Sequence, residues 1–442
     1  MNSSRTDGDT FACGNCGSPL DVHVELPAGV ISFEHPAWKS TDHPPEPVPA
    51  DSVEATYVCD FCTDPRILFV YHTERAVFAK VETVNGTVVR NYGTRWSACI
   101  ECAVLVEPRD LQGLVDRITA HKRALSTEVI AHLAVMLDQV LASLVPGRAL
   151  AVGGQWAIDP LPARTLPKIR DRLASLIGGE TALPFGLSHP NVRRPLAASL
   201  AGTRLFWIDN DFTELTRNAA EVMPRMRYAP GDLPAAHGFV AWTRPVDAHR
   251  SCIAASWGTY GDAVQLVGYR SVGSGLPPAR LQLLRTEVGW LIPVFAVALR
   301  PGQLVTAVHP AAALLTTWRL IRQRLAETAT TRADTSIRKS YQRARRPEPT
   351  IQLVSIRGAR TTSTSAQRAA SGNSNNRDYR WWVAPHWRHQ PHGPGRMLRD
   401  WIVVRPHLRG PQDKPIRTTT TVRVLGKLPP RPEITEQTTN AG

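Results

Sequence analysis

The sequence lacks long hydrophobic runs, so no membrane-spanning helix is predicted. Among the 442 residues the longest apolar stretches, such as Trp290–Leu299, have about ten residues, whereas a membrane-spanning helix needs about 20. The first residues also lack an apolar segment between a basic start and a cleavage site, so we expect no secretory signal. We therefore expect a cytoplasmic protein with no membrane partner, and a chain of this length predicts several domains.

The sequence also lacks the short motifs that identify a reaction. It has no glycine-rich phosphate loop, no nucleophile elbow and no His-Glu-x-x-His pair, so an enzymatic activity stays uncertain and a non-enzyme is favoured. The acidic group Asp209, Asp211 and Glu214 could bind magnesium. A helix N-terminus with a capping residue and acids in its first turn explains the same three residues, and we favour that interpretation.

Cysteine is scarce, but its placement is regular. Six of the seven cysteines form three Cys-x-x-Cys pairs, and such pairs in a reducing compartment are better interpreted as metal ligands than as disulfides. The pairs are Cys13 and Cys16, Cys59 and Cys62, and Cys99 and Cys102.

The second and third pairs predict one complete metal site. Four thiolates match the tetrahedral preference of Zn²⁺, and the two-residue spacer lets both sulfurs of a pair point at one ion. Between these pairs lie alternating apolar segments with an Asn-Gly hairpin signal at positions 85 and 86, which is the layout of a zinc ribbon. We expect Cys59, Cys62, Cys99 and Cys102 to hold a structural zinc ion, because a closed four-ligand shell leaves no position for water.

The first pair, Cys13 and Cys16, has no second pair to complete it. It could recruit His23 or another histidine, compete for the same ion, or remain as free thiols. The seventh cysteine, Cys252, stands among small and apolar residues, which is typical of buried packing.

Acidic residues are scarce in the last quarter of the chain, and basic residues are not. Trp318–Lys427 holds 23 Lys and Arg against 6 Asp and Glu, a net charge of +17, which leaves −3 for the rest of a chain whose total is +14. Such a block is typical of a surface that contacts a polyanion, with DNA and RNA both open. A solubilising surface or a flexible basic linker would have the same composition.

The stretch Arg380–Arg396 combines three tryptophans, three histidines and three arginines, and its Pro-His-x-Arg pattern recurs at Pro406–Arg409. We favour a nucleic-acid-binding surface in which arginines contact phosphates and tryptophans stack on bases. Two alternatives stay open: a metal-independent nuclease with His386 and His407 as acid and base, and a protein-interaction or accessory protein without nucleic-acid contact. The expected binding residues are Arg380, Trp382, Trp387, Arg388, Arg396, Arg399 and Arg409.

Periodicity and composition predict an α+β fold with several modules. The middle of the chain reads as helix, strand and helix over 195–223, followed by segments rich in Val, Trp and Tyr that favour an antiparallel sheet. The expected layout is a zinc-ribbon-like region at 1–108, a helical segment at 109–185, an α+β domain at 190–315, a basic helical connector at 316–350, a small basic β-rich domain at 351–428 with a mobile loop at 361–378, and a tail at 429–442.

A family resemblance appears in several separated segments. The Cys-x-x-Cys pairs, "WSACIECAVLVEPRD", "LPAAHGFVAWTRPV" and "LLTTWRLIRQRL" precede the most distinctive block, "HWRHQPHGPGR" with "VVRPHLRGPQDKPI". Together they resemble a set of uncharacterised multidomain proteins of actinobacteria and their phages or plasmids. The resemblance implies an architecture and a mobile-element context, and it carries no known activity.

Overall fold

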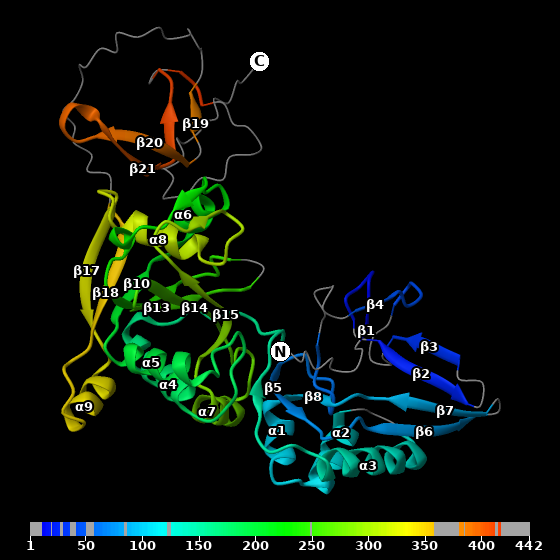
Figure 1. Ribbon diagram of the computed structural model, residues 1–442. Helices are drawn as coiled ribbons and strands as arrows, with labels where there is room; N and C mark the ends of the chain where they lie inside the picture. Colours follow the sequence, from blue (N-terminus) through cyan, green and yellow to red (C-terminus); the bar gives the residue numbers. More distant parts are fainter. Residues whose placement is uncertain are drawn as a thin grey trace, which may run out of the picture. The chain divides into compact units, whose positions relative to one another are not determined.

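The computed structural model describes residues 11–18, 20–26, 30–35, 41–49, 57–83, 86–121, 125–247, 250–357, 380–383, 385–411 and 414–416 (Figure 1). The chain divides into two compact units. Unit 1 comprises Met1–Asp159, Lys168–Ala201 and Tyr269–Ala296, and unit 2 comprises Pro160–Pro167, Gly202–Gly268 and Val297–Gly442.

In its described residues, unit 1 contains three small sheets of its own. Its central strand, β5 (Ile67–His72), is an apolar run with five buried residues, and it pairs antiparallel with β8 (Arg95–Cys99) and β9 (Ala149–Leu150). A strand covered on both faces must be apolar throughout, which explains the run. The other two sheets are a four-stranded one in the order β3 (Val30–Glu34), β2 (Asp21–Leu26), β7 (Gly86–Asn91), β6 (Phe78–Thr83), and the pair β1 (Phe11–Cys13) and β4 (Pro47–Pro49).

Helix α1 (Ile100–Val106) begins directly after β8, and α2 (Leu111–His121) and α3 (Thr127–Ala142) follow it within the segment that was predicted to be helical. Pro108 separates the first two, because proline disfavours helix in the residue before it. Unit 1 also contains all or most of α4 (Leu166–Gly178), α5 (Pro190–Ala201) and α7 (Pro278–Glu287).

A seven-stranded mixed sheet dominates unit 2. Its order is β15 (Leu291–Leu299), β14 (Ala263–Ser271), β13 (Ala254–Tyr260), β12 (His237–Trp242), β10 (Arg204–Ile208), β18 (Thr350–Ile356), β17 (Ala326–Arg332), and the boundary between the units falls within β14 and β15. β10 runs parallel to both β12 and β18. The expected antiparallel pairing is confirmed for β12 with β13. Strand β10 departs from it because helix α6 (Asn210–Glu221) follows β10 and allows a crossover to a parallel strand.

The core of unit 2 is rich in large aromatic side chains. Trp242, Trp257 and Trp318 are all buried, and the rings of Trp257 and Trp318 lie edge to face with centroids 5.2 Å apart. Gly238 lies directly opposite Trp257 in the β12–β13 pair, and a Cβ at Gly238 would overlap the indole ring. This position needs glycine because only a residue without a side chain leaves room for the ring.

Helices α6 (Asn210–Glu221), α8 (Ala312–Ile321) and α9 (Thr335–Arg343) complete unit 2. Asp209 is the N-cap of α6 and accepts a hydrogen bond from the Phe212 backbone N–H at 2.8 Å, so the capping interpretation of this acidic group is confirmed. The continuous basic helix predicted over 316–350 is wrong in its middle. Strand β17 lies between α8 and α9, and its Thr328, Thr330 and Thr331 are β-branched residues that favour a strand.

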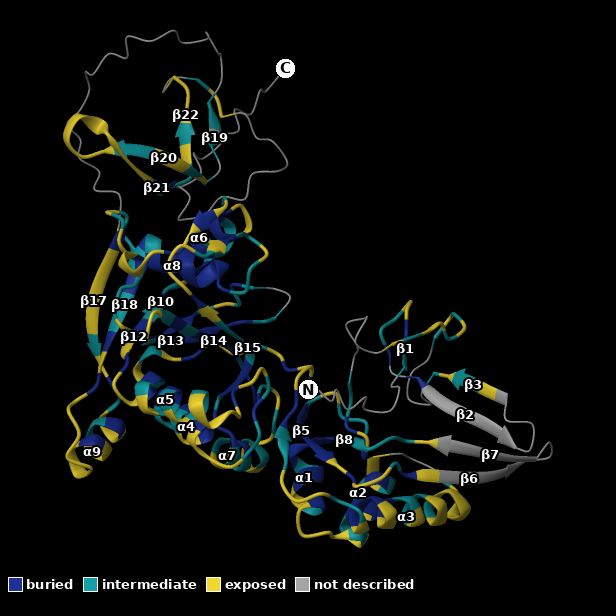
Figure 2. Ribbon diagram, viewed as in Figure 1, coloured by how far each residue is buried: buried dark blue, intermediate teal, exposed yellow. Residues whose placement is uncertain are grey.

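The C-terminal part of unit 2 holds two short antiparallel pairs, β20 (His386–His392) with β21 (Leu398–Val404), and β19 (Trp381–Val383) with β22 (His407–Arg409). Figure 2 shows that the turn joining β20 and β21 is exposed, whereas much of the two strands is half-buried. Another two-stranded pair joins β11 (Met226–Arg227) to β16 (Leu304–Val305). The expected loop at 361–378 and the tail at 429–442 lie outside the described residues.

None of the helices in the described ranges has the length and apolar character that crossing a membrane requires.

Candidate functional site

The four cysteines predicted as one site come together in unit 1. Cys59 and Cys62 lie in a turn before β5, Cys99 ends β8, and Cys102 lies in the first turn of α1. The antiparallel pairing of β5 with β8 sets Ile67 opposite Cys99 and brings the two pairs to the same end of the sheet.

The turn that carries Cys59 and Cys62 is fastened to β8. Within the turn, Cys59 N–H donates to Asp64 O at 2.9 Å and Thr63 N–H donates to Cys59 O at 2.8 Å, with Thr63 at a φ of 64°. Asp60 N–H donates to Ser97 O at 2.8 Å, and the Asp60 carboxylate accepts from Ser97 N–H. The backbone therefore holds the first pair against the strand that carries the second.

The geometry of the Cys59, Cys62, Cys99 and Cys102 tetrad fits a tetrahedral metal ion. All four residues are at most 3% exposed, their sulfurs lie within 4.8 Å of one another, and the Cys62 and Cys99 sulfurs are 3.6 Å apart. A tetrahedral ion with metal–sulfur bonds of about 2.3 Å places two sulfurs about 3.8 Å apart. All seven cysteines are free thiols, so no disulfide competes for these sulfurs.

The pKa shifts of the tetrad thiols also favour a bound cation. Burial raises the pKa of the Cys59 thiol well above its ordinary value, whereas hydrogen bonds from Cys102 and the other neighbouring thiols lower the pKa of Cys62. Four thiols packed together cannot all ionise on their own, because each thiolate repels the next. A divalent ion removes this conflict, since it deprotonates a coordinating thiol outright.

Arg117 places N–H donors next to three of the four sulfurs of the tetrad. Its Nε–H lies 3.3 Å from Cys102 Sγ, and its Nη2 lies 3.8 Å from both Cys62 Sγ and Cys99 Sγ. Glu101 holds the guanidinium in place by an ion pair and also pairs with Arg280. A metal bound by four thiolates carries a net charge of about −2, so this arginine offsets part of the buried negative charge.

Cys13 and Cys16 do not join the tetrad. They lie beside His35 and His43 in a second group of four side chains. His23 was the histidine considered from the sequence, and its side chain lies outside the described residues. His35 and His43 were missed because no fixed spacing links them to the cysteine pair. Cys252 is buried, as predicted, and its Sγ donates to Ala254 O at 3.3 Å.

A cavity in unit 1 is lined by polar groups that already satisfy one another. Glu107 accepts a hydrogen bond from the Tyr71 hydroxyl at 3.0 Å and pairs with Arg148, whose Nη2 lies 2.7 Å from Glu287. The Arg148 guanidinium also lies 4.0 Å from the centre of the Phe69 ring. These residues cross-link β5, α1 and α7, and their pairing gives them a structural role.

The predicted nucleic-acid-binding residues lie on the two C-terminal strand pairs of unit 2. Arg388, Arg396, Arg399 and Arg409 are exposed, and Arg409 lies 6.0 Å from the centre of the Trp381 ring. Arg380 is half-buried beside Ile416. The side chain of Trp382 lies outside the described residues. Trp387 is half-buried and donates its indole N–H to Ala219 O at 2.8 Å.

The two histidines of the nuclease alternative lie on strands that do not pair with each other. Among the described strands, His386 in β20 is opposite Val404 of β21, and His407 in β22 is opposite Val383 of β19. His407 Nδ1 interacts with Arg405 O at 3.0 Å. The nuclease alternative needs both histidines at one site, which pairing of their strands would provide. The described strands do not form that pair.

Comparisons with protein-family models, with curated proteins and with solved structures find no match for this chain. The resemblance noted from the sequence stays a prediction, and the function has to be inferred from the residues themselves.

Proposed function

We propose that the chain is a nucleic-acid-binding protein, with an N-terminal unit stabilised by zinc and a basic β20–β21 hairpin that contacts phosphates. The observation that carries this proposal is an anchored hairpin that exposes arginines within a segment of net charge +17. From His386 to Val404 the hairpin holds three arginines, and Asp400 is its single acidic residue. Clustered arginines on a protruding element are typical of phosphate contact.

One face of the hairpin base holds it to the rest of unit 2. Trp387 and Val403 are opposite each other in the β20–β21 register and therefore point to the same face. Trp387 bonds to Ala219 at the end of α6, and Val403 is buried and donates its N–H to Gln323 Oε1 at 3.2 Å. Because strand residues alternate, Arg388 and His386 point to the opposite face, where both are exposed.

The end of the hairpin combines positive charge with exposed apolar side chains. Met397 is 83% exposed and Leu398 is 56% exposed, and both lie between Arg396 and Arg399. Gly393 and Gly395 have φ of 75° and 59°, so the turn uses left-handed backbone that glycine adopts without strain. Arginines beside an apolar tip are the combination that proteins use to contact a groove and insert between base steps.

Zinc is the metal that the Cys59, Cys62, Cys99 and Cys102 tetrad fits best. Four thiolates with tetrahedral geometry select zinc or an iron–sulfur centre, and two Cys-x-x-Cys pairs with the shortest spacer are typical of a structural zinc site. Bound zinc would cross-link the turn before β5, the end of β8 and the start of α1. Its role in the proposal is to stabilise unit 1, since four protein ligands leave no position for a substrate.

The proposal is tested by measuring retention of labelled single-stranded and double-stranded DNA and RNA by the zinc-loaded full chain. We expect binding at low salt to at least one of these, with an affinity that falls steeply as salt rises, because each neutralised phosphate releases counterions. No retention of any of the four at low salt would overturn the proposal and would favour an acidic protein partner for the basic segment.

A further inference from the structure

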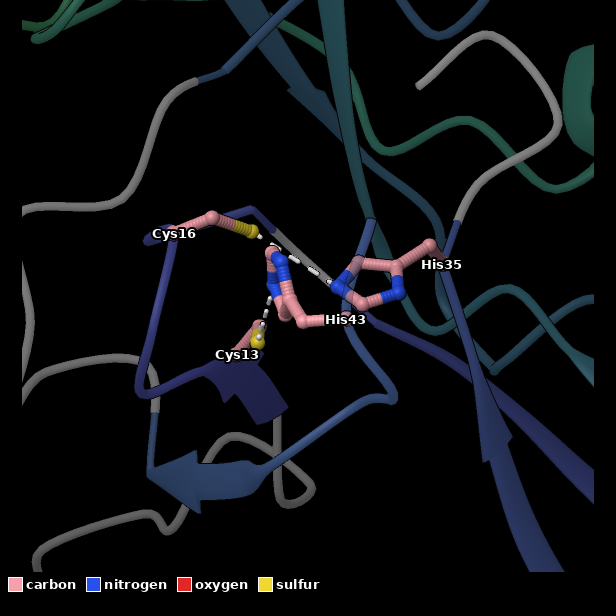
Figure 3. Close-up of side chains that lie close together, drawn as sticks. All are labelled: Cys13, Cys16, His35 and His43. Carbon is pink, nitrogen blue, oxygen red and sulfur yellow. Dashed lines mark hydrogen bonds between the residues drawn. The ribbon is translucent and has the colours of Figure 1, made fainter. Parts of the chain in front are cut away.

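We propose that Cys13, Cys16, His35 and His43 form a second zinc site, independent of the Cys59, Cys62, Cys99 and Cys102 tetrad and of any nucleic-acid contact. Figure 3 shows the two thiols and the two imidazole rings converging on one point, with each cysteine next to one histidine. Four ligands of this composition form one of the standard structural sets for zinc.

Three separate segments bring the four side chains together. Cys13 is the last residue of β1, His35 follows β3, and His43 precedes β4. The β1–β4 pairing sets Cys13 opposite Pro47, and Gly14 N–H donates to Glu46 O at 2.8 Å. The segment that carries His43 is thereby tied to the turn that carries both cysteines.

The turn around Cys13 and Cys16 has the same backbone hydrogen bonds as the turn around Cys59 and Cys62. In the first, Cys13 N–H donates to Ser18 O at 2.8 Å, and Gly17 N–H donates to Cys13 O at 2.8 Å. In the second, the corresponding bonds are Cys59 to Asp64 and Thr63 to Cys59. The fourth residue after the first cysteine has a φ of 65° in one turn and 64° in the other. The first pair therefore forms the same metal-binding knuckle as the second.

The distances between donor atoms match a tetrahedral ion. Cys13 Sγ lies 3.5 Å from His43 Nε2, and Cys16 Sγ lies 3.6 Å from His35 Nε2. Bonds of about 2.3 Å to sulfur and about 2.05 Å to nitrogen place the two donors about 3.6 Å apart in a tetrahedron. The two imidazole rings are nearly perpendicular, at 86° with centroids 5.0 Å apart, so both can direct Nε2 at one ion without stacking.

The second nitrogen of each ring has the partner that a metal-bound histidine requires. His43 Nδ1 lies 3.2 Å from Asp42 Oδ1, and His35 Nδ1 lies 3.3 Å from Thr41 Oγ1. Thr41 donates its own hydroxyl hydrogen to His43 O at 3.4 Å, so its oxygen can accept a hydrogen bond from His35 Nδ1–H. Both rings then carry their proton on Nδ1 and present the Nε2 lone pair to the ion. Such outer partners orient metal-binding histidines and strengthen their binding.

Cys13 is buried, whereas Cys16, His35 and His43 are half-buried. The site lies closer to solvent than the tetrad, so its ion should exchange more readily. It adds a cross-link between β1, β3 and β4, which are short strands with little buried apolar surface of their own. This role fits a small region that needs metal to stay folded.

The test has two measurements. The first is the zinc content of the purified full chain, and the second is the absorption spectrum of the same chain with Co²⁺ in place of zinc. We expect two zinc ions in the unaltered chain and one in the double variant His35→Ala/His43→Ala, whose remaining cobalt spectrum should be that of a four-thiolate site. His43→Cys should retain two ions because it replaces one ligand with another. His132→Ala is the matched control, since this exposed histidine bonds to Glu128 O in its own helix.

One zinc ion in the unaltered chain, unchanged by the double variant, would overturn the second site. Loss of both ions in the double variant, with an unfolded far-ultraviolet spectrum, would contradict its independence from the tetrad. These outcomes are separate from nucleic-acid retention, so failure of the site and failure of the proposed function can be told apart.

Discussion

The indole N–H of Trp387 donates to the backbone carbonyl of Ala219 at 2.8 Å, across 168 residues of sequence. Ala219 lies in the last turn of α6, where the backbone carbonyls have no N–H partner within the helix. The bond therefore satisfies a helix end and fixes β20 to α6. In the proposed function, Trp387 positions the arginines of the hairpin against the body of unit 2.

Trp387→Ala should loosen the hairpin, because it removes both the hydrogen bond and the half-buried ring. We expect amide hydrogens in β21 to exchange faster, with a loss of about 1–3 kcal/mol in the local opening free energy. Trp387→Phe keeps the ring and should lose only about 1 kcal/mol. Equal exchange in β21 for the two variants and the unaltered chain would show that Trp387 does not anchor the hairpin.

Arg117→Ala should weaken metal binding at the Cys59, Cys62, Cys99 and Cys102 tetrad without removing a ligand. Loss of its N–H groups next to three sulfurs should reduce the metal affinity by about 10- to 100-fold, as expected for an outer partner. Competition with a chromogenic chelator measures this change. The control is Arg75→Ala, an exposed arginine of the same unit, and an equal effect of both variants would contradict a specific role for Arg117.

The two proposed zinc ions should leave the protein at different rates. The tetrad is buried and enclosed by Arg117, whereas three of the four ligands in the Cys13, Cys16, His35 and His43 group are half-buried. We expect two phases of zinc release to excess chelator, with the fast phase absent in His43→Ala and the slow phase accelerated in Arg117→Ala. A single phase that neither substitution alters would contradict this order.

Gly238→Ala should destabilise unit 2, because its new methyl group would occupy the place of the Trp257 ring. We expect a loss of about 1–3 kcal/mol, typical of an overpacked core, measured as a lower midpoint of chemical unfolding. Gly231→Ala is the matched control, since nothing lies within 4 Å of its added methyl group. An unfolding midpoint that Gly238→Ala leaves unchanged would show that the indole can move aside at no cost.

Features encoded by neighbouring residues were predictable from the sequence. The Asn-Gly signal does mark a hairpin, since Thr83 is opposite Gly86 in the β6–β7 pair. The cysteine tetrad followed from two pairs of fixed spacing, and the helix, strand and helix over 190–221 followed from periodicity. The hairpin does not join the two zinc knuckles in one ribbon, however, because β6 and β7 belong to the sheet of β2 and β3, whereas β5 and β8 lie in a different sheet.

Features set by distant pairing were not predictable. His43 reaches the cysteines through the pairing of β1 with β4, and His35 reaches them from the end of β3 in another sheet, and no spacing in the sequence reports either arrangement. β18 was assigned to the C-terminal basic region, and it pairs instead with β10, more than a hundred residues earlier in the chain. Edge strand β17 carries mostly exposed side chains, so it shows no apolar alternation from which a strand could be predicted.

The salt dependence of nucleic-acid affinity tests the central claim most directly. The measurement compares the zinc-loaded full chain with Arg388→Ala/Arg399→Ala, and with Arg300→Ala as a control, whose side chain is 73% exposed outside the hairpin. If the hairpin contacts phosphates, the double variant should bind more weakly, and its slope of log affinity against log salt should be shallower by about 1 to 2. The control should match the unaltered chain. Equal affinity and equal slope in all three proteins would contradict the account.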